Sequence, residues 1–346
     1  MFYDGNVSAE RKEEKKQSKY AIDVENLRVR YETSSEVVMA VNGIDLQLKR
    51  GVTLGIVGET GAGKTTSMLS LMNLIETPPG VVEADHIYVN GTDVQRLSAA
   101  ELCKIRGNEI AMIFQDPMTS LNPVMKVGEQ ISESIMLHGR VSKKEAMERA
   151  ARMLEIVGIS PSRASEYPHQ FSGGMRQRVG IAIALACKPE ILIADEPTTA
   201  LDVTIQAQVL KLMKQLKTEY GTSMILITHD LGVVARMCDE VAVMYAGRIV
   251  EQGTLKQIFN ETLHPYTEGL FNSLPNIHNR VASLKPIPGL MPDPANLPQG
   301  CAFAKRCPYA AQACYAEQPA RKTYEDGHSV WCTAYRDAEF HIKRKG

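Results

Sequence analysis

The chain has 346 residues, of which 44% are hydrophobic and 23% charged, and this ordinary globular composition excludes a disordered, collagen-like or disulfide-dense protein. Lysine plus arginine (39) nearly cancels aspartate plus glutamate (40), so a formal net charge of −1 gives no general attraction for nucleic acid, and we expect no such partner. The apolar stretches all fall far short of the ~20 residues that a membrane-spanning helix needs.

The N-terminal residues 1–19 mix charges of both signs and carry too little apolar surface to fold alone, so we expect a flexible tail that is not a secretory signal. From 20 to 258, helical segments alternate with short β-branched runs such as 53–57, 191–194 and 223–228. Continuous apolar strands of this kind predict an α/β core with a parallel sheet covered on both faces.

Two segments depart from this alternation. Residues 116–170 have helical periodicity and no convincing strand, which predicts an inserted helical subdomain. Residues 259–346 are rich in proline and contain the last four of the seven cysteines, which predicts a separate, irregular C-terminal extension.

A glycine-rich segment, GETGAGKT, follows the first of these strands and matches the pattern G-x-x-x-x-G-K-[ST]. Its glycines let backbone N–H groups curve around phosphates, and the following helix adds positive potential at its N-terminus. We expect Lys64 to reach the β- and γ-phosphates and Thr65 to bind Mg²⁺. The predicted nucleotide contacts are Gly58, Glu59, Thr60, Gly61, Ala62, Gly63, Lys64, Thr65 and Thr66.

Two adjacent carboxylates, Asp195 and Glu196, end the strand 191–194 and therefore lie at the carboxyl edge of the predicted sheet, where α/β folds bind ligands. Asp195 suits the Mg²⁺ shell. Glu196 is then available to polarise an attacking water beside the γ-phosphate.

The segment FSGGMRQR, residues 171–178, supplies an N-cap hydroxyl at Ser172 and an unobstructed backbone at Gly173 and Gly174, which together make an anion site at a helix start. Here the sequence resembles the ATP-binding subunits of ABC transporters, whose signature reads LSGGQ. It departs from that signature at Phe171 and Met175.

This resemblance covers about 20–258, and it implies a P-loop ABC ATPase core: a RecA-like, mostly parallel sheet with an antiparallel β subdomain and the inserted helical subdomain. Gln115 resembles the glutamine that senses Mg²⁺ and the attacking water, and His229 resembles the switch histidine on the γ-phosphate. Asp202 belongs to a D-loop-like ALD sequence. Tyr31 resembles the aromatic that stacks on adenine, although a tyrosine in a strand is usually a packing residue.

The family also implies that the chain works in pairs. Two ATPase subunits sandwich two ATP molecules head to tail, and the signature helix of each completes the site of the other. ATP binding closes the dimer and hydrolysis releases it. The helical insert receives the coupling helices of membrane subunits.

Two further stretches, 114–123 (FQDPMTSLNP) and 264–266 (His-Pro-Tyr), resemble the dipeptide/oligopeptide and nickel importer branch. That branch implies an ATPase bound peripherally to the cytoplasmic face of the inner membrane. Its partners are a second ATPase subunit, two permeases and, through them, an extracytoplasmic peptide-binding protein. We expect the second ATPase to be a homologous but different chain, and a second copy of this chain is the alternative. An importer of nickel, opines or oligosaccharides is the alternative to a peptide importer, and a soluble ABC ATPase is a less favoured one. We assign His264 no chemical role.

The four late cysteines, Cys301, Cys307, Cys314 and Cys332, are spaced C-x5-C-x6-C-x17-C. Four thiolates can hold zinc or a [4Fe–4S] cluster, but the spacing lacks the C-x2-4-C pairs of most zinc sites, so residues alone leave cluster, zinc and buried thiols open. The segment resembles the cysteine-bearing extension of the dipeptide-permease D-type subunit. That resemblance implies a [4Fe–4S] cluster, with zinc as the alternative. We expect the cluster to be structural or regulatory because the sequence shows no second redox centre or flavin motif.

Overall fold

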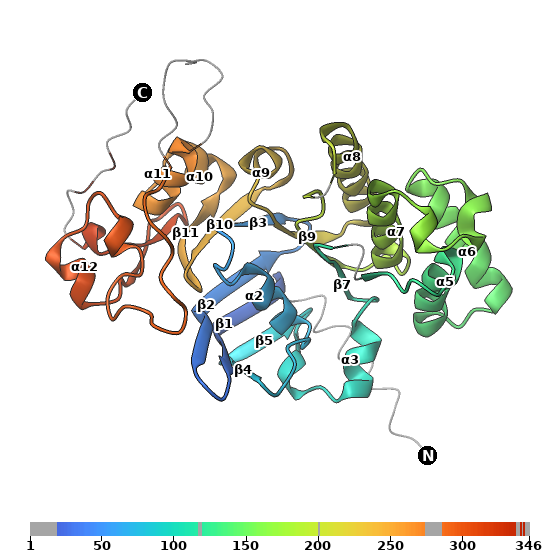
Figure 1. Ribbon diagram of the computed structural model, residues 1–346, viewed down its shortest axis with the longest axis horizontal. Helices are drawn as coiled ribbons and strands as arrows, with labels where there is room; N and C mark the ends of the chain where they lie inside the picture. The colour runs from blue at the N-terminus through green and yellow to red at the C-terminus, as the bar shows by residue number, and fades with distance from the viewer. Residues whose placement is uncertain are drawn as a thin grey trace.

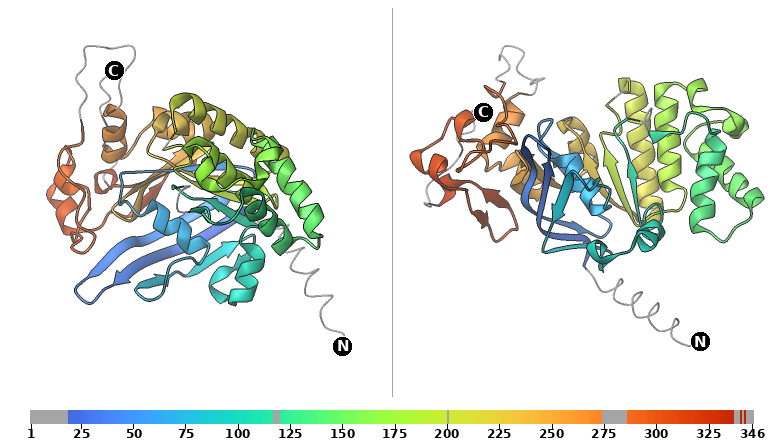
Figure 2. Two further views of the ribbon diagram at one scale, coloured as in Figure 1. Left: turned by 45° about the vertical axis from the view of Figure 1, so that its right-hand side comes forward. Right: turned by 60° about the horizontal axis from the view of Figure 1, so that its bottom comes forward.

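The computed structural model describes residues 19–116, 120–199, 201–273 and 286–336, together with Phe340 and Ile342. The predicted N-terminal tail lies outside the described residues except for its last residue. Figure 1 shows two sheets in the middle of the molecule, with a helical region (green) and a C-terminal region (orange to red) at opposite ends. The helical and C-terminal regions also lie at opposite ends of the molecule in both views of Figure 2.

The N-terminal sheet is antiparallel, as the resemblance implied. It consists of β2 (Val37–Lys49), β1 (Tyr20–Glu32), β5 (His86–Val89) and β6 (Thr92–Asp93) in that order, with β4 (Gly80–Glu83) also paired to β1. Ile22, Val24 and Leu27 of β1 are buried, so one face of this sheet packs on the core.

The main sheet has eight strands, and its larger part is parallel. Its order is β12 (Arg321–Thr323), β13 (Ser329–Trp331), β11 (Arg248–Thr254), β10 (Glu240–Tyr245), β3 (Thr53–Val57), β9 (Ser223–Ile227), β8 (Ile191–Asp195) and β7 (Ile110–Ile113). Neighbours from β10 to β7 pair in parallel. Every residue of β3, β8 and β9 is buried, which confirms the predicted sheet with both faces covered.

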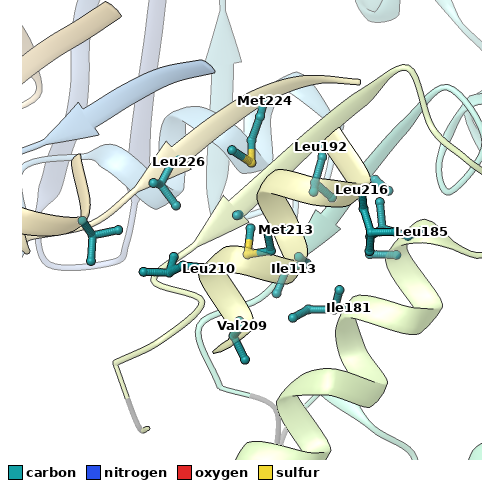
Figure 3. Close-up of a cluster of buried hydrophobic side chains, with 14 of the residues drawn as sticks. Ile113, Ile181, Leu185, Leu192, Val209, Leu210, Met213, Leu216, Met224 and Leu226 are labelled. Atoms are coloured by element: carbon teal, nitrogen blue, oxygen red, sulfur yellow. The ribbon is translucent and has the colours of Figure 1, made fainter. Parts of the chain in front are cut away.

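Helices cover the main sheet because their apolar faces pack against the buried side chains of its strands. Figure 3 shows Ile181 and Leu185 of α7 (Gly173–Leu185) close to Met213 and Leu216 of α8 (Val203–Tyr220), over the strands β7 to β9. On the side of the N-terminal sheet, α2 (Lys64–Leu71) buries Met68 in the same hydrophobic cluster as residues of β1 and β3. The helices α3 (Ala99–Ile105) and α9 (Leu231–Met237) complete the core.

The helical region contains α5 (Val127–His138), α6 (Lys143–Ile156) and the short 3₁₀ turns η2 (Pro161–Ser165) and η3 (Pro168–Gln170), and its described residues form no strand. Ser142 caps α6 by accepting a hydrogen bond from the Glu145 N–H at 3.2 Å. Ala146, Ala150 and Leu154 form its buried stripe. The limits assigned to this subdomain stay a prediction.

The C-terminal region, which the sequence predicted as a separate, irregular extension, has short helices and strands. It contains α10 (Leu255–Asn260), α11 (Pro265–Asn272), η4 (Ala304–Arg306), α12 (Gln312–Ala316) and η5 (Thr333–Tyr335) besides β12 and β13. The strand β13 pairs with β11 and so lengthens the main sheet. The carboxylate of Glu251 on β11, fully buried, accepts the backbone N–H of Leu263 and His264 and lies 3.0 Å from Nε2 of His328. These buried contacts tie the extension to the core because an unpaired carboxylate there would be costly.

Candidate functional site

The phosphate-binding loop lies between β3 and α2, in the place that its motif requires. Gly63 caps α2 with a φ of 93°, and a Cβ there would lie 2.5 Å from the carbonyl oxygen of Ala40, so only glycine fits. The Lys64 ammonium, 7% exposed, folds over the loop and donates to the carbonyl oxygens of Gly58 (2.8 Å) and Glu59 (3.0 Å). Burial lowers the pKa of Lys64, against the opposing effect of nearby carboxylates.

A pair of oxygen ligands suited to Mg²⁺ stands at the start of α2. The Thr65 hydroxyl donates to Oδ2 of Asp195 at 2.7 Å, while Oδ1 of Asp195 is buried without a hydrogen-bond partner in the part of the chain described. Burial raises the pKa of Asp195, and the neighbouring Glu196 adds to this, although Thr65 and Lys64 oppose it. Carboxylate and hydroxyl oxygens are the donors that Mg²⁺ prefers, so these residues fit the ion.

Glu196 sits at the centre of a hydrogen-bonded group. Its Oε2 accepts from the Gln115 amide at 3.2 Å and from the Thr199 hydroxyl at 2.8 Å, and its Oε1 lies 3.3 Å from Nδ1 of His229. The residue has a φ of 43°, a conformation that is strained for a side chain of this size. Sequence reasoning missed Thr199, whose only signal was a hydroxyl three residues after the carboxylate.

These groups share one cleft of about 400 Å³. Its lining consists of Thr60, Gly61, Gly63, Lys64, Thr65, Thr66, Gln115, Glu196, Thr199 and His229. Of the other predicted loop residues, Ala62 is fully buried. Tyr31 does not line the cleft; it lies on β1, paired with Val38 of β2 and Gly80 of β4.

The signature-like residues stand apart from this cleft, at the starts of two helices. Ser172 caps α7 by accepting from the Met175 N–H at 3.4 Å, and Asp202 caps α8 by accepting from the Ile205 N–H at 2.9 Å. A Cβ on Gly174 would lie 2.9 Å from Cγ2 of Ile205, so the glycine lets these helices approach closely. Ser172 and Gly173 are exposed.

The two departures from the signature pattern are linked through Arg163. Phe171 is 3% exposed, and the Arg163 guanidinium lies 4.4 Å from its ring centroid. The same guanidinium donates to the sulfur of Met175 at 3.3 Å. The substituted positions therefore pack within the chain's own helical region.

The four late cysteines are brought near one another. The Cys301 N–H donates to the carbonyl oxygen of Cys314 at 2.7 Å. Burial first, and then the neighbouring cysteines, raise the thiol pKa of Cys307 to about 11 and that of Cys332 to about 12. Among the described residues, however, no three His, Cys, Asp or Glu side chains are placed to hold a metal ion. Among the described residues, the four cysteines therefore lie near one another, but their side chains are not arranged as ligands of a cluster.

Comparison with known families gives two matches along the chain. Residues 41–199 match the ABC transporter family, and residues 250–314 match the C-terminal region of oligopeptide/dipeptide transporters. Within the described residues, no helix is long and apolar enough to cross a membrane.

Individual proteins agree with these matches. The oligopeptide transport ATP-binding protein AppD of Bacillus subtilis is 49% identical over 91% of this chain and 97% of its own length. The dipeptide transport ATP-binding protein DppD of the same species is 51% identical over 78% of this chain and 81% of its own. Among solved structures, a dimeric, post-hydrolysis ATP-binding cassette, MJ0796 bound to ADP and Pi, superposes with a TM-score of 0.62 at 29% identity, covering 68% of this chain and 98% of that one.

Proposed function

The chain belongs to the ABC transporter family of ATP-binding proteins, and from this premise we propose that it binds and hydrolyses ATP to energise a peptide importer. The family confirms the predicted fold class and ATPase activity. The observation that carries the proposal is the single cleft in which the phosphate-binding loop, Gln115, Glu196 and His229 meet.

Each of these groups has a part in phosphoryl transfer that its position supports. Lys64 would exchange its two backbone carbonyl partners for the β- and γ-phosphates. Thr65 and Asp195 would hold Mg²⁺, which when bound neutralises charge on the phosphates. Glu196 would accept a proton from the attacking water, and Gln115 and His229 hold the carboxylate in place from either side.

The exposed signature segment supports assembly with a second ATPase subunit. Ser172, Gly173 and Gly174 present a helix N-terminus, which attracts anions, yet none of them lines the chain's own cleft. In a head-to-tail pair, this end and Asp202 would close over the ATP of the partner. Adenine would stack on Tyr31 of the chain that holds the phosphates.

The importer itself is inferred from the C-terminal match and from relatives that are named as oligopeptide or dipeptide transport proteins. We place the chain at the cytoplasmic face of the inner membrane, with two permeases, a second ATPase chain and an extracytoplasmic binding protein. A nickel, opine or oligosaccharide importer uses the same ATPase architecture, since the ATPase never touches the cargo.

Affinity purification from mildly solubilised membranes, followed by mass spectrometry, tests the assembly. We expect two multi-span permeases and a second ATPase to be recovered, and the ligand of the associated binding protein to be a peptide. A nickel or sugar ligand would move the proposal to another cargo of the same branch. Recovery of ribosomes or nucleic acid, with no permease, would overturn the importer and favour a soluble ABC ATPase.

For the cysteines, we propose that Cys301, Cys307, Cys314 and Cys332 hold a [4Fe–4S] cluster, with zinc as the alternative. Four thiols within electrostatic reach of one another support this ligand set. When bound, the cluster would cross-link the extension. Anaerobic purification and analysis of iron, sulfide and zinc test the proposal: stoichiometric iron and sulfide are expected, and stoichiometric zinc without iron would contradict it.

A further inference from the structure

The second residue of the phosphate-binding loop, Glu59, is held by side chains from the C-terminal extension. Its backbone N–H donates to the Tyr266 hydroxyl at 2.9 Å. Its carboxylate receives both terminal nitrogens of Arg306, at 2.8 and 3.0 Å, in a bidentate pair. Its carbonyl oxygen accepts from Lys64. Every polar group of this loop residue is therefore engaged, two of the three by the extension.

The Arg306 side chain is buried and held by several hydrogen bonds, unlike the arginine of an ordinary surface ion pair. Its side chain is 7% exposed. Besides Glu59, the guanidinium donates to the backbone oxygens of Pro288 (2.9 Å) and Ile287 (3.4 Å) and to the Tyr245 hydroxyl (3.2 Å). If the guanidinium moved away from Glu59, its buried N–H donors would lose their partners at a cost in free energy. It therefore has little freedom to turn away from the loop.

The turn that presents Arg306 is part of the cysteine-bearing segment. Within η4 and its flanks, the Ala304 N–H donates to the carbonyl oxygen of Cys301 at 3.0 Å, and the Cys307 N–H donates to that of Ala304 at 3.3 Å. Arg306 thus lies in a hydrogen-bonded turn bounded by two of the four cysteines, so the position of its guanidinium depends on how that turn is held.

A second contact from the same extension reaches the loop. A Cβ built on Gly61 would lie 3.1 Å from the terminal methyl of Met291, so this methionine covers the loop at that glycine. Further along, the Met39 N–H of β2 donates to the carbonyl oxygen of Pro294 at 2.9 Å, and this bond holds the segment of the extension that carries Met291. The extension therefore contacts the loop at Glu59 and Gly61 and also reaches β2 of the neighbouring sheet.

We propose that Arg306 is a positioning residue for nucleotide binding, which sets the conformation of the phosphate-binding loop through Glu59. The inference rests on the proposed ATPase function and adds to it a control of the loop by the C-terminal extension. Because Arg306 lies outside the cleft lining and touches neither Lys64 nor Glu196, its removal should weaken the binding of ATP and leave the chemical step intact.

Titration of the full-length chain with a fluorescent ATP analogue and Mg²⁺ tests this, together with KM and kcat of the assembled transporter. We expect Arg306→Gln to weaken nucleotide binding by roughly 5- to 20-fold, within the usual range for coupling between sites, and to raise KM at unchanged kcat. Arg306→Lys should recover only part of the affinity, since a lysine keeps the charge and loses the bidentate geometry. The matched control is Arg336→Gln, which removes an exposed ion pair with Glu317 in the same extension and should bind ATP as the wild type does.

The pairing with Glu59 is tested by a double-mutant cycle. Glu59→Gln alone should weaken binding about as much as Arg306→Gln, and the double variant should show little further loss, because both changes remove one interaction. If Arg306→Gln unfolds, as its melting curve would show, Arg306→Lys and Glu59→Gln decide the matter in its place. Wild-type affinity in these variants would overturn the inference and leave the ATPase untouched, whereas a wild-type chain that binds no ATP would overturn the proposed function itself.

Discussion

The two halves of an ABC nucleotide site differ sharply in this chain. The half around the phosphate-binding loop is built from buried side chains: Lys64, Asp195 and Glu196 are all less than a tenth exposed and hold one another by hydrogen bonds or charge. The half around the signature segment is exposed at Ser172 and Gly173, and the Ser172 hydroxyl caps its own helix. The first half is completed by the chain's own side chains, and we propose that the second faces the ATP of a partner subunit.

This difference is what we expect if, as proposed, a second ATPase subunit completes the nucleotide site. Buried, preorganised donors are needed where charge develops during phosphoryl transfer, because reorganising them at that moment would cost rate. A surface that must close and reopen on each cycle has to be exposed in between. Substitutions in the first half should therefore affect chemistry, and those in the second should affect assembly.

The largest effect is expected from Glu196→Gln in the buried half. The amide keeps the shape and loses the carboxylate that accepts the proton of water, so ATP turnover should fall by about 100- to 10,000-fold while ATP binding persists. We expect the variant to trap the ATP-bound dimer, detectable by light scattering of the complex. Glu190→Gln, at an exposed residue just before β8, is the matched control. Undiminished turnover in Glu196→Gln would refute its assignment as the base.

A smaller loss is expected from Gly173→Asp in the exposed half. A Cβ at Gly173 meets open space, so the fold should tolerate the change. The added anion would face the phosphates of the partner's ATP, and like charges across an interface cost several kcal/mol, so turnover should fall by on the order of 100-fold. Binding of ATP to the isolated chain should be unchanged.

Gly180→Asp controls for the helix, because a Cβ there also meets open space on α7. Equal loss of turnover in the two glycine variants would indicate damage to the helix and would remove the evidence for a partner's ATP at Gly173.

The smallest effect is expected from Tyr31→Ala. Stacking on a base is worth ~1–3 kcal/mol, and a ring that also packs in a strand should give the lower part of that range, or about tenfold weaker ATP binding. Tyr88→Ala, in the same sheet, is the matched control and should bind ATP normally. Equal ATP affinity in Tyr31→Ala and the wild type would make Tyr31 a packing residue.

Much of the buried half could be proposed from the sequence because its residues lie in short, contiguous patterns. The motif around Lys64, its preceding strand and the acidic end of β8 each follow from local spacing, and parallel strands bring their carboxyl ends to one edge. The fold class followed from the same alternation. Gln115 and His229 entered only through a family resemblance, since neither has a local pattern of its own.

Contacts made by the extension could not be predicted in this way. Arg306 and Glu59 are 247 positions apart, and no local signal links them. The strand β13 is three residues long and lacks a periodic pattern, so its pairing with β11 could not be predicted from the sequence. Thr199 was missed because a hydroxyl after a strand is ordinary in sequence and acquires meaning only beside Glu196.

The most direct test of the proposal that a partner subunit completes the nucleotide site is ATP turnover per chain. It should be measured for the isolated monomer and for the membrane-extracted complex. We predict that the monomer binds ATP with negligible turnover and that the complex hydrolyses it. Full turnover by a monomer, at concentrations where light scattering detects no dimer, would contradict the claim that a partner completes the site.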